Sequence, residues 1–111
     1  MSNEFAHGQN EAKVKVKVKR ILAEVGAWYC MPRGTVLGRS GVPDFLVCLH
    51  GRFIGIETKS GSNKPTALQA KELLDIERHH GMSFVVNERT LPEFEQKIKL
   101  LARAWGNVSG W

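Results

Sequence analysis

Residues 42–60 read VPDFLVCLHGRFIGIETKS, and this stretch decides the fold of the chain. Two apolar runs of strand length are separated by a short segment containing a glycine, which is the sequence pattern of a β-hairpin. Three charged residues, Asp44, Glu57 and Lys59, are nevertheless set into these strands. Unpaired charges are costly inside an apolar element, so we expect these three residues to have partners or a function.

The turn of this hairpin determines which charged residues face one another. A two-residue turn at residues 50–51, with glycine in second place, puts Asp44 opposite Glu57. A turn at residues 51–52 puts Asp44 opposite Lys59 and diagonal to Glu57 instead. Side chains alternate between the two faces of a strand, and both registers have the same parity. Both therefore predict that the three charged side chains lie on one face of the hairpin.

Two acidic side chains on one face need a positive group between them. Directly opposite residues have Cβ atoms roughly 4.5–5.5 Å apart, and carboxylates that close repel each other. Lys59 could supply the positive charge, in which case the three residues form a satisfied surface cluster. A divalent cation is the alternative, and ligation by oxygen alone favours Mg²⁺ or Mn²⁺. The pattern by itself leaves both interpretations open.

The segments on either side of the hairpin complete an α/β pattern. We expect a loose polar leader over residues 1–10 and a single domain over residues 11–111. The expected elements are a helix over 11–25, strands over 27–31, 44–50 and 52–59, a helix over 66–80, a strand over 83–88 and a helix over 91–104. This order, α-β-β-β-α-β-α, predicts a mixed sheet flanked by helices.

The lysine-rich segment KVKVKVK, residues 13–19, alternates like a strand but belongs to a longer helical pattern. Apolar residues recur at helical spacing through Val14, Val18, Ile21, Leu22 and Val25. Asn10 is the expected N-cap and Gly26 the expected stop. The outer face would carry Lys13, Lys15, Lys17, Lys19 and Arg20. Such a run is either a solvated face or a surface that contacts DNA.

Composition narrows the function classes. The 111 residues include 16 Lys and Arg against 11 Asp and Glu, a net charge of +5 that favours a polyanionic partner but also simply aids solubility. Cys30 and Cys48 lie in apolar strand-like runs and are expected to be buried, reduced thiols. Neither zinc-type Cys/His spacing nor a Walker-type loop occurs. Without a signal peptide or an apolar run near 18 residues, a cytoplasmic protein with no membrane association is expected.

The charged residues of the hairpin, read with their neighbours, resemble a nuclease signature. Pro-Asp at 43–44, followed by Glu-Thr-Lys at 57–59, is similar to the PD-(D/E)xK motif. The longer string GRSGVPDFLV…GRFIGIETKSG…KPTALQ, with Gln69 at its end, resembles the VRR-NUC branch of that superfamily over residues 11–88. The resemblance implies a restriction-endonuclease-like αβββαβ core and a metal-dependent DNA endonuclease.

The resemblance also implies roles for individual residues. The expected ligands of Mg²⁺ or Mn²⁺ are Asp44, Glu57, the backbone carbonyl of Thr58, and Glu11. Lys59 would orient the attacking water and stabilise charge on the phosphate, and Gln69 would support the site. The implied substrate is branched DNA, including four-way junctions, in phage-type replication or repair. A small nuclease of this kind is expected to act as a homodimer.

Glu11 also stands out by its helical phase. It precedes Val14 by three residues and Val18 by seven, so it shares the apolar stripe that would face the sheet. An acid there is costly without a partner. An ordinary first-turn acid, favoured by the helix dipole, has the same appearance, and the sequence leaves the two interpretations equal.

The candidates for phosphate contact are Arg33, Arg39 and Lys64, on composition alone. An alternative function uses the basic surface to bind nucleic acid without cleaving it. In that interpretation the chain is a non-catalytic nucleic-acid-binding module, Lys59 neutralises the two acids, and the lysine-rich helix makes the contacts.

Overall fold

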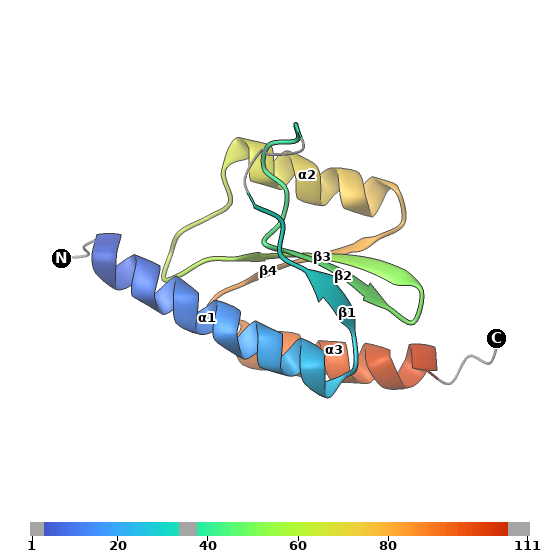
Figure 1. The fold of residues 1–111 in the computed structure, drawn as a ribbon. Helices are drawn as coiled ribbons and strands as arrows, with labels where there is room; N and C mark the ends of the chain where they lie inside the picture. Colours follow the sequence, from blue (N-terminus) through green and yellow to red (C-terminus); the bar gives the residue numbers. More distant parts are fainter. Residues whose placement is uncertain (1–3, 34–37, 107–111) are drawn as a thin grey trace.

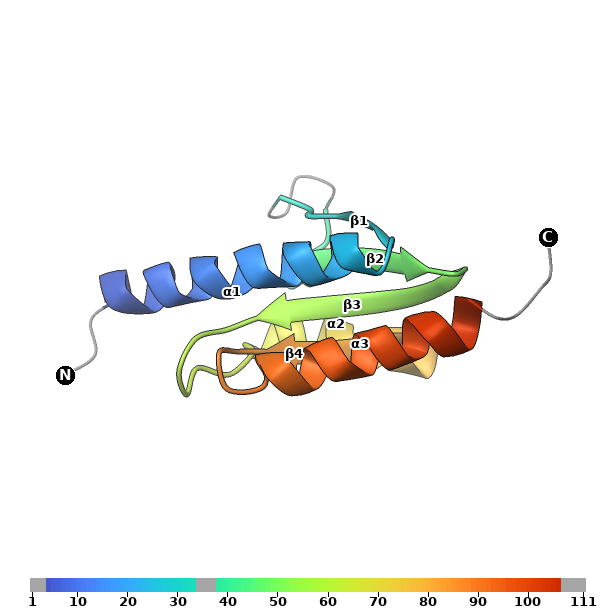
Figure 2. The ribbon, with the colours of Figure 1, turned by 90° about the horizontal axis from the view of Figure 1, so that it is seen from below.

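The computed structural model describes residues 4–33 and 38–106, with the side chains of residues 10–33 and 38–106. Helices α1 (Glu4–Glu24) and α3 (Leu91–Gly106) cover one face of a four-stranded sheet, and α2 (Ala67–Arg78) lies on the other face (Figures 1 and 2). The predicted α/β class, a mixed sheet flanked by helices in the order α-β-β-β-α-β-α, is confirmed.

The strands lie in the sheet in chain order: β1 (Trp28–Cys30), β2 (Phe45–Leu49), β3 (Arg52–Thr58) and β4 (Met82–Val86). The first three are antiparallel, whereas β4 runs parallel to β3. Parallel neighbours require a crossover connection, which α2 provides. The carboxyl ends of β3 and β4 therefore meet at one edge of the sheet, where β2 begins.

The hairpin adopts the register with its turn at residues 50–51. Leu49 pairs with Arg52, and the turn residues His50 and Gly51 have φ values of 49° and 84°. Two successive positive φ values define the type I′ turn that joins twisted antiparallel strands. The ladder ends where Phe45 faces Ile56, so the predicted pairing of Asp44 with Glu57 across the strands is not formed.

Helix α1 resolves the ambiguity of the alternating valines and lysines. Val14 and Val18 are 2% and 0% exposed, whereas Val16 between them is 63% exposed. That difference is the signature of a helix, because an amphipathic strand would bury all three valines on one face. The helix begins at Glu4, so the loose leader over residues 1–10 and the N-cap at Asn10 were wrong as far as residues 4–10 are concerned. A glycine such as Gly8 costs a helix only about 1 kcal/mol, which a long packed helix tolerates.

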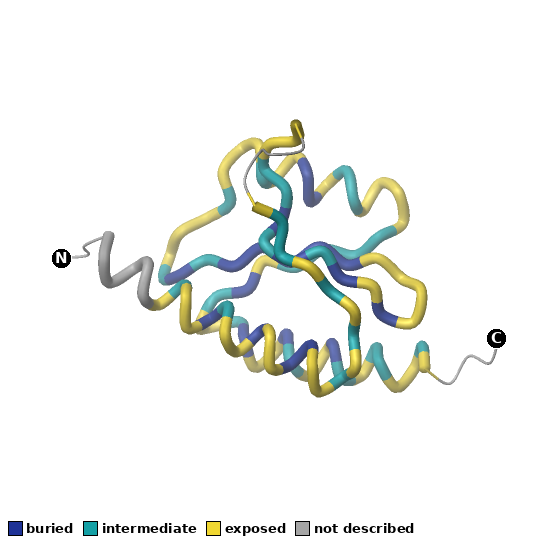
Figure 3. Tube along the Cα trace, viewed as in Figure 1, coloured by how far each residue is buried: buried dark blue, intermediate teal, exposed yellow. Residues whose placement is uncertain are grey.

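The hydrophobic core lies between the sheet and the α1–α3 pair, and the outward surfaces of these helices are exposed (Figure 3). Val18, Ile21 and Leu22 of α1 are fully buried against this face of the sheet. On α3, Phe94 is buried and Trp105 packs at the margin of the core. Trp105 therefore helps to close the core, while Trp111 lies outside the described residues.

The opposite face of the sheet is covered only in part. Trp28, Cys48 and Phe53 lie side by side across β1, β2 and β3, and Trp28 and Phe53 are 64% and 45% exposed. Cys30 and Cys48 are free thiols and both are exposed, so the prediction of buried thiols was wrong. The apolar runs suggested burial on both faces, but α2 packs mainly on β3 and β4, and Trp28, Cys30 and Cys48 on the other two strands are exposed.

Helices long and apolar enough to cross a membrane are not found in the part of the chain that the structure describes.

Candidate active site

The carboxyl end of β3 brings Glu57 and Lys59 together, as the strand alternation predicted. Their side chains are 3% and 14% exposed, and the Lys59 ammonium lies 3.4 Å from Glu57 Oε2. Lys59 is held in place by its backbone N–H, which donates to the carbonyl of Val86 on β4 at 2.9 Å. The parallel neighbour strand therefore fixes the position of the lysine relative to the carboxylate.

Asp44 reaches the same end of β3 from the bend that precedes β2. Its Oδ2 accepts two hydrogen bonds from Thr58, one from the backbone N–H at 2.9 Å and one from the hydroxyl at 2.6 Å. Thr58 is fully buried and points to the face opposite Glu57 by strand alternation. Asp44 therefore lies at the edge of the sheet, between the two faces, rather than across the ladder from Glu57.

Glu57 occupies an unfavourable position for a charged group. Burial raises the pKa of Glu57 to about 7, and the nearby charge of Asp44 adds to the rise, while Lys59 and the backbone of Asp44 oppose it. Among the described residues, nothing forms a hydrogen bond with its buried Oε1. A buried carboxylate oxygen without a partner is destabilising, and it is the kind of atom that a cation would satisfy.

Glu11 lies beside this group without joining it directly. Its side chain is 30% exposed, and Glu11 Oε2 lies 3.6 Å from the ammonium of Lys15, one helical turn further along α1. The same ammonium lies 4.0 Å from Asp44 Oδ1. Lys15 thus connects the first helix to the strand residues. It was predicted to belong to the outer face of the helix, but its side chain is only 32% exposed.

Gln69 has a local structural role in the first turn of α2. Its side-chain oxygen accepts a hydrogen bond from the Thr66 backbone N–H at 2.9 Å, and the Thr66 hydroxyl accepts one from the Gln69 N–H at 3.2 Å. This reciprocal pair is a capping box. Gln69 is half-buried, one helical turn before the buried Leu73.

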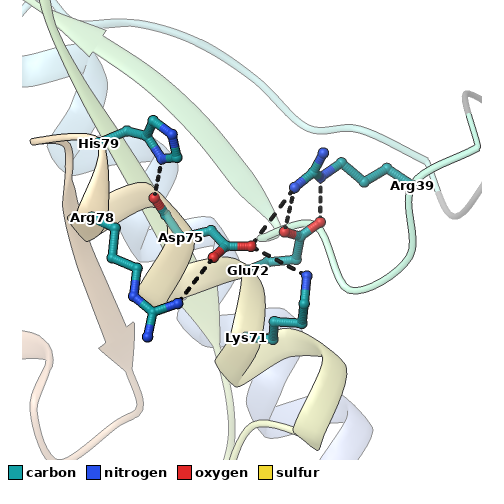
Figure 4. A network of polar contacts seen from close by, with 6 residues as sticks. All are labelled: Arg39, Lys71, Glu72, Asp75, Arg78 and His79. Carbon is teal, nitrogen blue, oxygen red and sulfur yellow. Dashed lines mark hydrogen bonds and ion pairs between the residues drawn. The ribbon is translucent and has the colours of Figure 1, made fainter.

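Arg39 is paired with acidic side chains of helix α2, although its own side chain is 66% exposed. Its guanidinium binds both carboxylate oxygens of Glu72, with Nη2 donating to Oε2 at 2.9 Å, and lies 3.9 Å from Asp75 Oδ2. Figure 4 shows this network along α2, which also includes Lys71 and Arg78. Arg39 lowers the pKa of the Glu72 carboxyl by donating this hydrogen bond. The pair ties the loop that leads into Asp44 to helix α2.

The two other candidates for phosphate contact are exposed. Arg33 lies next to residues 34–37, which fall outside the described part of the chain, and Lys64 lies in the loop before α2. A cavity of about 970 Å³ lies beside α2 and is lined by Arg33, Arg39 and apolar side chains such as Phe53. The residues that line this cavity do not include Asp44, Glu57 or Lys59, so it is separate from the carboxylates.

Two of the three acidic residues predicted to bind the cation, Asp44 and Glu57, have an oxygen available for it. Asp44 Oδ1 and Glu57 Oε1 are the two oxygens that no hydrogen bond engages within the described residues, and both belong to the hard ligand type that Mg²⁺ and Mn²⁺ prefer. A set of three acidic, histidine or cysteine side chains gathered at metal distance is not found among the residues described. Glu11 is therefore not in place as a third ligand, because Lys15 lies between it and Asp44.

The contacts that Thr58 and Lys15 make with Asp44 were not predicted from the sequence. The predicted role of Thr58 was its backbone carbonyl, whereas its N–H and hydroxyl are the groups that contact Asp44. Lys15 was assigned to the run of basic residues on the outer face of the helix, although two signals pointed inward. It follows Glu11 by four residues, the spacing of a helical ion pair, and it precedes the buried Val18 by three.

Comparison with known proteins gives no relative: no family model matches the chain, and neither a curated protein nor a solved structure matches it.

Proposed function

We propose that this protein is a metal-dependent nuclease that hydrolyses phosphodiester bonds in DNA. The observation that carries the proposal is the buried pair of Glu57 and Lys59 beside Asp44, in which Glu57 Oε1 has no partner among the described residues. A structural ion pair would satisfy its own oxygens. A carboxylate left unsatisfied next to a second carboxylate and an ammonium is instead suited to a cation and a phosphate.

Each residue has a distinct part in the proposed chemistry. Asp44 Oδ1 and Glu57 Oε1 would hold Mg²⁺ or Mn²⁺, with Thr58 fixing the orientation of Asp44. When bound, such a cation polarises a phosphate and lowers the pKa of a water ligand. Lys59, 3.4 Å from Glu57, would position that water and stabilise the negative charge that develops on the phosphate. The carbonyl of Thr58 and the carboxylate of Glu11 remain proposed further ligands.

DNA is the proposed substrate because the chain has an excess of basic residues. The net charge is +5, and the exposed lysines Lys13, Lys17 and Lys19 follow the outer side of α1. Lys64 adds an exposed positive charge before α2. These groups would contact phosphates on either side of the scissile bond. On the basis of the resemblance to VRR-NUC nucleases, we propose branched DNA, including four-way junctions, as the substrate. The proposed process is phage-type replication or repair, and the proposed location is the cytoplasm.

A homodimer is proposed as the working form, since cutting both strands of a branched substrate requires two sites. The row formed by Trp28, Cys48 and Phe53 gives the chain an apolar surface that a second subunit could cover. Two-fold symmetry is the usual arrangement for such a pair.

A panel of DNA substrates tests the proposal. Purified protein is incubated with linear, nicked, flap and four-way-junction DNA, each with Mn²⁺, with Mg²⁺ and with EDTA. We expect cleavage with either metal, fastest on a branched substrate, and no cleavage in EDTA. Intact substrates across the whole panel would contradict the nuclease assignment.

A second function is favoured by the two lysines of the site. Lys59 and Lys15 already lie against the three carboxylates, as a non-catalytic nucleic-acid-binding module would require. Such a module would bind DNA with a strong dependence on salt and would not respond to Mn²⁺. A nuclease would be stabilised against heating by Mn²⁺, because a ligand that binds only the folded state raises its stability.

A further inference from the structure

Lys15 lies where helix α1 meets the strands of the site. Its ammonium is 3.6 Å from Glu11 Oε2 and 4.0 Å from Asp44 Oδ1. The distance to Glu11 is that of an ordinary i, i+4 helical pair. The approach to Asp44 joins two parts of the chain that are far apart in sequence, so it depends on how the helix packs against the sheet.

The oxygen that Lys15 approaches is the one that remains available on Asp44. Thr58 donates two hydrogen bonds to Oδ2 and so turns Oδ1 away from itself, toward Lys15. The proposed function uses that same Oδ1 as a metal ligand. An ammonium and a divalent cation repel each other strongly at such short separations, so both cannot lie against Oδ1 at once.

The two lysines of the site form ion pairs with different carboxylates. Lys59 is the counter-charge of Glu57, at 3.4 Å, and Lys15 is shared by Glu11 and Asp44. The two ion pairs differ in accessibility. The Lys59 side chain is 14% exposed and enclosed by the sheet, whereas that of Lys15 is 32% exposed and can move aside along the helix surface.

We propose that Lys15 is a positioning residue that competes with the metal ion for Asp44 Oδ1 and thereby sets the metal affinity of the site. The inference rests on the proposed function, because it concerns the same carboxylates. Without metal, the single positive charge of Lys15 is shared by Asp44 and Glu11. When a cation arrives, Lys15 leaves Oδ1, which frees both Asp44 and Glu11 toward the metal.

A metal titration of matched variants tests this role without measuring cleavage. Lys15→Gln removes the competing charge, Lys15→Arg keeps it, and Lys17→Gln removes one positive charge from an exposed position on the same helix. The Mn²⁺ concentration at half-saturation is measured for each protein by calorimetry and by thermal stabilisation. The buffer contains about 0.15 M salt, so that interactions between distant surface charges are screened.

We expect Lys15→Gln to bind Mn²⁺ about fivefold more tightly than the wild type, the size expected for losing a partly exposed competing ion pair. Lys17→Gln and Lys15→Arg should remain within about twofold of the wild type. Equal midpoints for Lys15→Gln and Lys17→Gln, with a wild type that binds Mn²⁺, would overturn this inference and leave the proposed function standing. A folded wild type that does not bind Mn²⁺ would overturn both.

Discussion

Thr58 donates both its backbone N–H and its hydroxyl to the same carboxylate oxygen of Asp44, at 2.9 Å and 2.6 Å. This contact joins the last residue of β3 to the bend before β2, where the ladder of backbone hydrogen bonds has already ended at Phe45 and Ile56. It fixes the orientation of Asp44 and leaves Oδ1 for another partner. The geometry of the proposed metal site therefore depends on a side chain that is not itself a ligand.

Replacing Thr58 with valine should destabilise the protein and weaken metal binding. Thr58 is fully buried, so the substitution removes one hydrogen bond to a charged group without changing the side-chain shape greatly. We expect a loss of about 1.5–3 kcal/mol in the free energy of unfolding, measured by urea denaturation in EDTA. Thr58→Ser keeps the hydroxyl and should lose less than half as much. Equal losses in the two variants would show that packing, not the hydrogen bond, accounts for the effect.

Stability in the absence of metal should fall between acidic and neutral pH because of Glu57. Its pKa is raised to about 7 in the folded state, from an ordinary value of 4.5, chiefly by burial and by the charge of Asp44. The folded protein thus keeps a proton that the unfolded chain releases at lower pH. The stability from protonated Glu57 is complete below about pH 4.5 and is lost as the pH rises through 7.

Glu57→Gln isolates this effect, because glutamine stays neutral at every pH. Urea denaturation in EDTA should give similar stabilities for both proteins at pH 5. At pH 8 the wild type should be less stable than Glu57→Gln by up to about 3 kcal/mol, following about 1.4 kcal/mol per unit of pKa shift. A constant difference between the two proteins from pH 5 to pH 8 would show that Glu57 does not titrate in this range.

The loop before Asp44 should tolerate no side chain at Gly41. A Cβ added there would lie 2.7 Å from the backbone carbonyl of Leu68 on α2, and the residue has a φ of +78°. Gly26 has a similar φ of +71° with nothing within 4 Å of an added Cβ, so Gly26→Ala measures the conformational cost alone.

We expect Gly26→Ala to cost about 1–2 kcal/mol and Gly41→Ala about 1–3 kcal/mol more, because backbone atoms must move apart. The displaced loop should also shift Asp44 and reduce cleavage by up to about a hundredfold, measured at a temperature where both variants are folded. If Gly41→Ala matches Gly26→Ala in both stability and cleavage, the loop does not position Asp44.

Much of the fold could be predicted from local sequence patterns, because the packing of distant elements did not change the structure that these patterns favour. Of the two hairpin registers that the sequence left open, the structure adopts the one with the histidine–glycine turn, because a type I′ turn needs two positive φ values and Gly51 supplies one without strain. The spacing of Val14 and Val18 identified α1 against the alternating pattern. Strand alternation, which is the same in both registers, placed Glu57 and Lys59 on one face. These features depend on residues near one another in sequence.

What the sequence could not predict depends on how distant elements pack. The ladder stops one residue short of Asp44, and the carboxylate turns to Thr58 instead of facing Glu57. Cys30 and Cys48 are exposed because α2 covers only part of its face of the sheet. The contact between Lys15 and Asp44 likewise depends on the placement of α1, which no local pattern encodes.

The central claim, that Asp44 is a metal ligand of a nuclease, is tested most directly by Asp44→Asn. Asparagine has nearly the same shape and can still accept a hydrogen bond from Thr58, so the fold should persist. Asp75→Asn is the matched control, since Asp75 lies in the ion-pair network of α2. The rate of Mn²⁺-dependent cleavage of branched DNA is measured for both variants and the wild type. We predict that Asp75→Asn cleaves at nearly the wild-type rate and that Asp44→Asn is slower by at least about a thousandfold. Equal cleavage rates in Asp44→Asn and Asp75→Asn would contradict the claim.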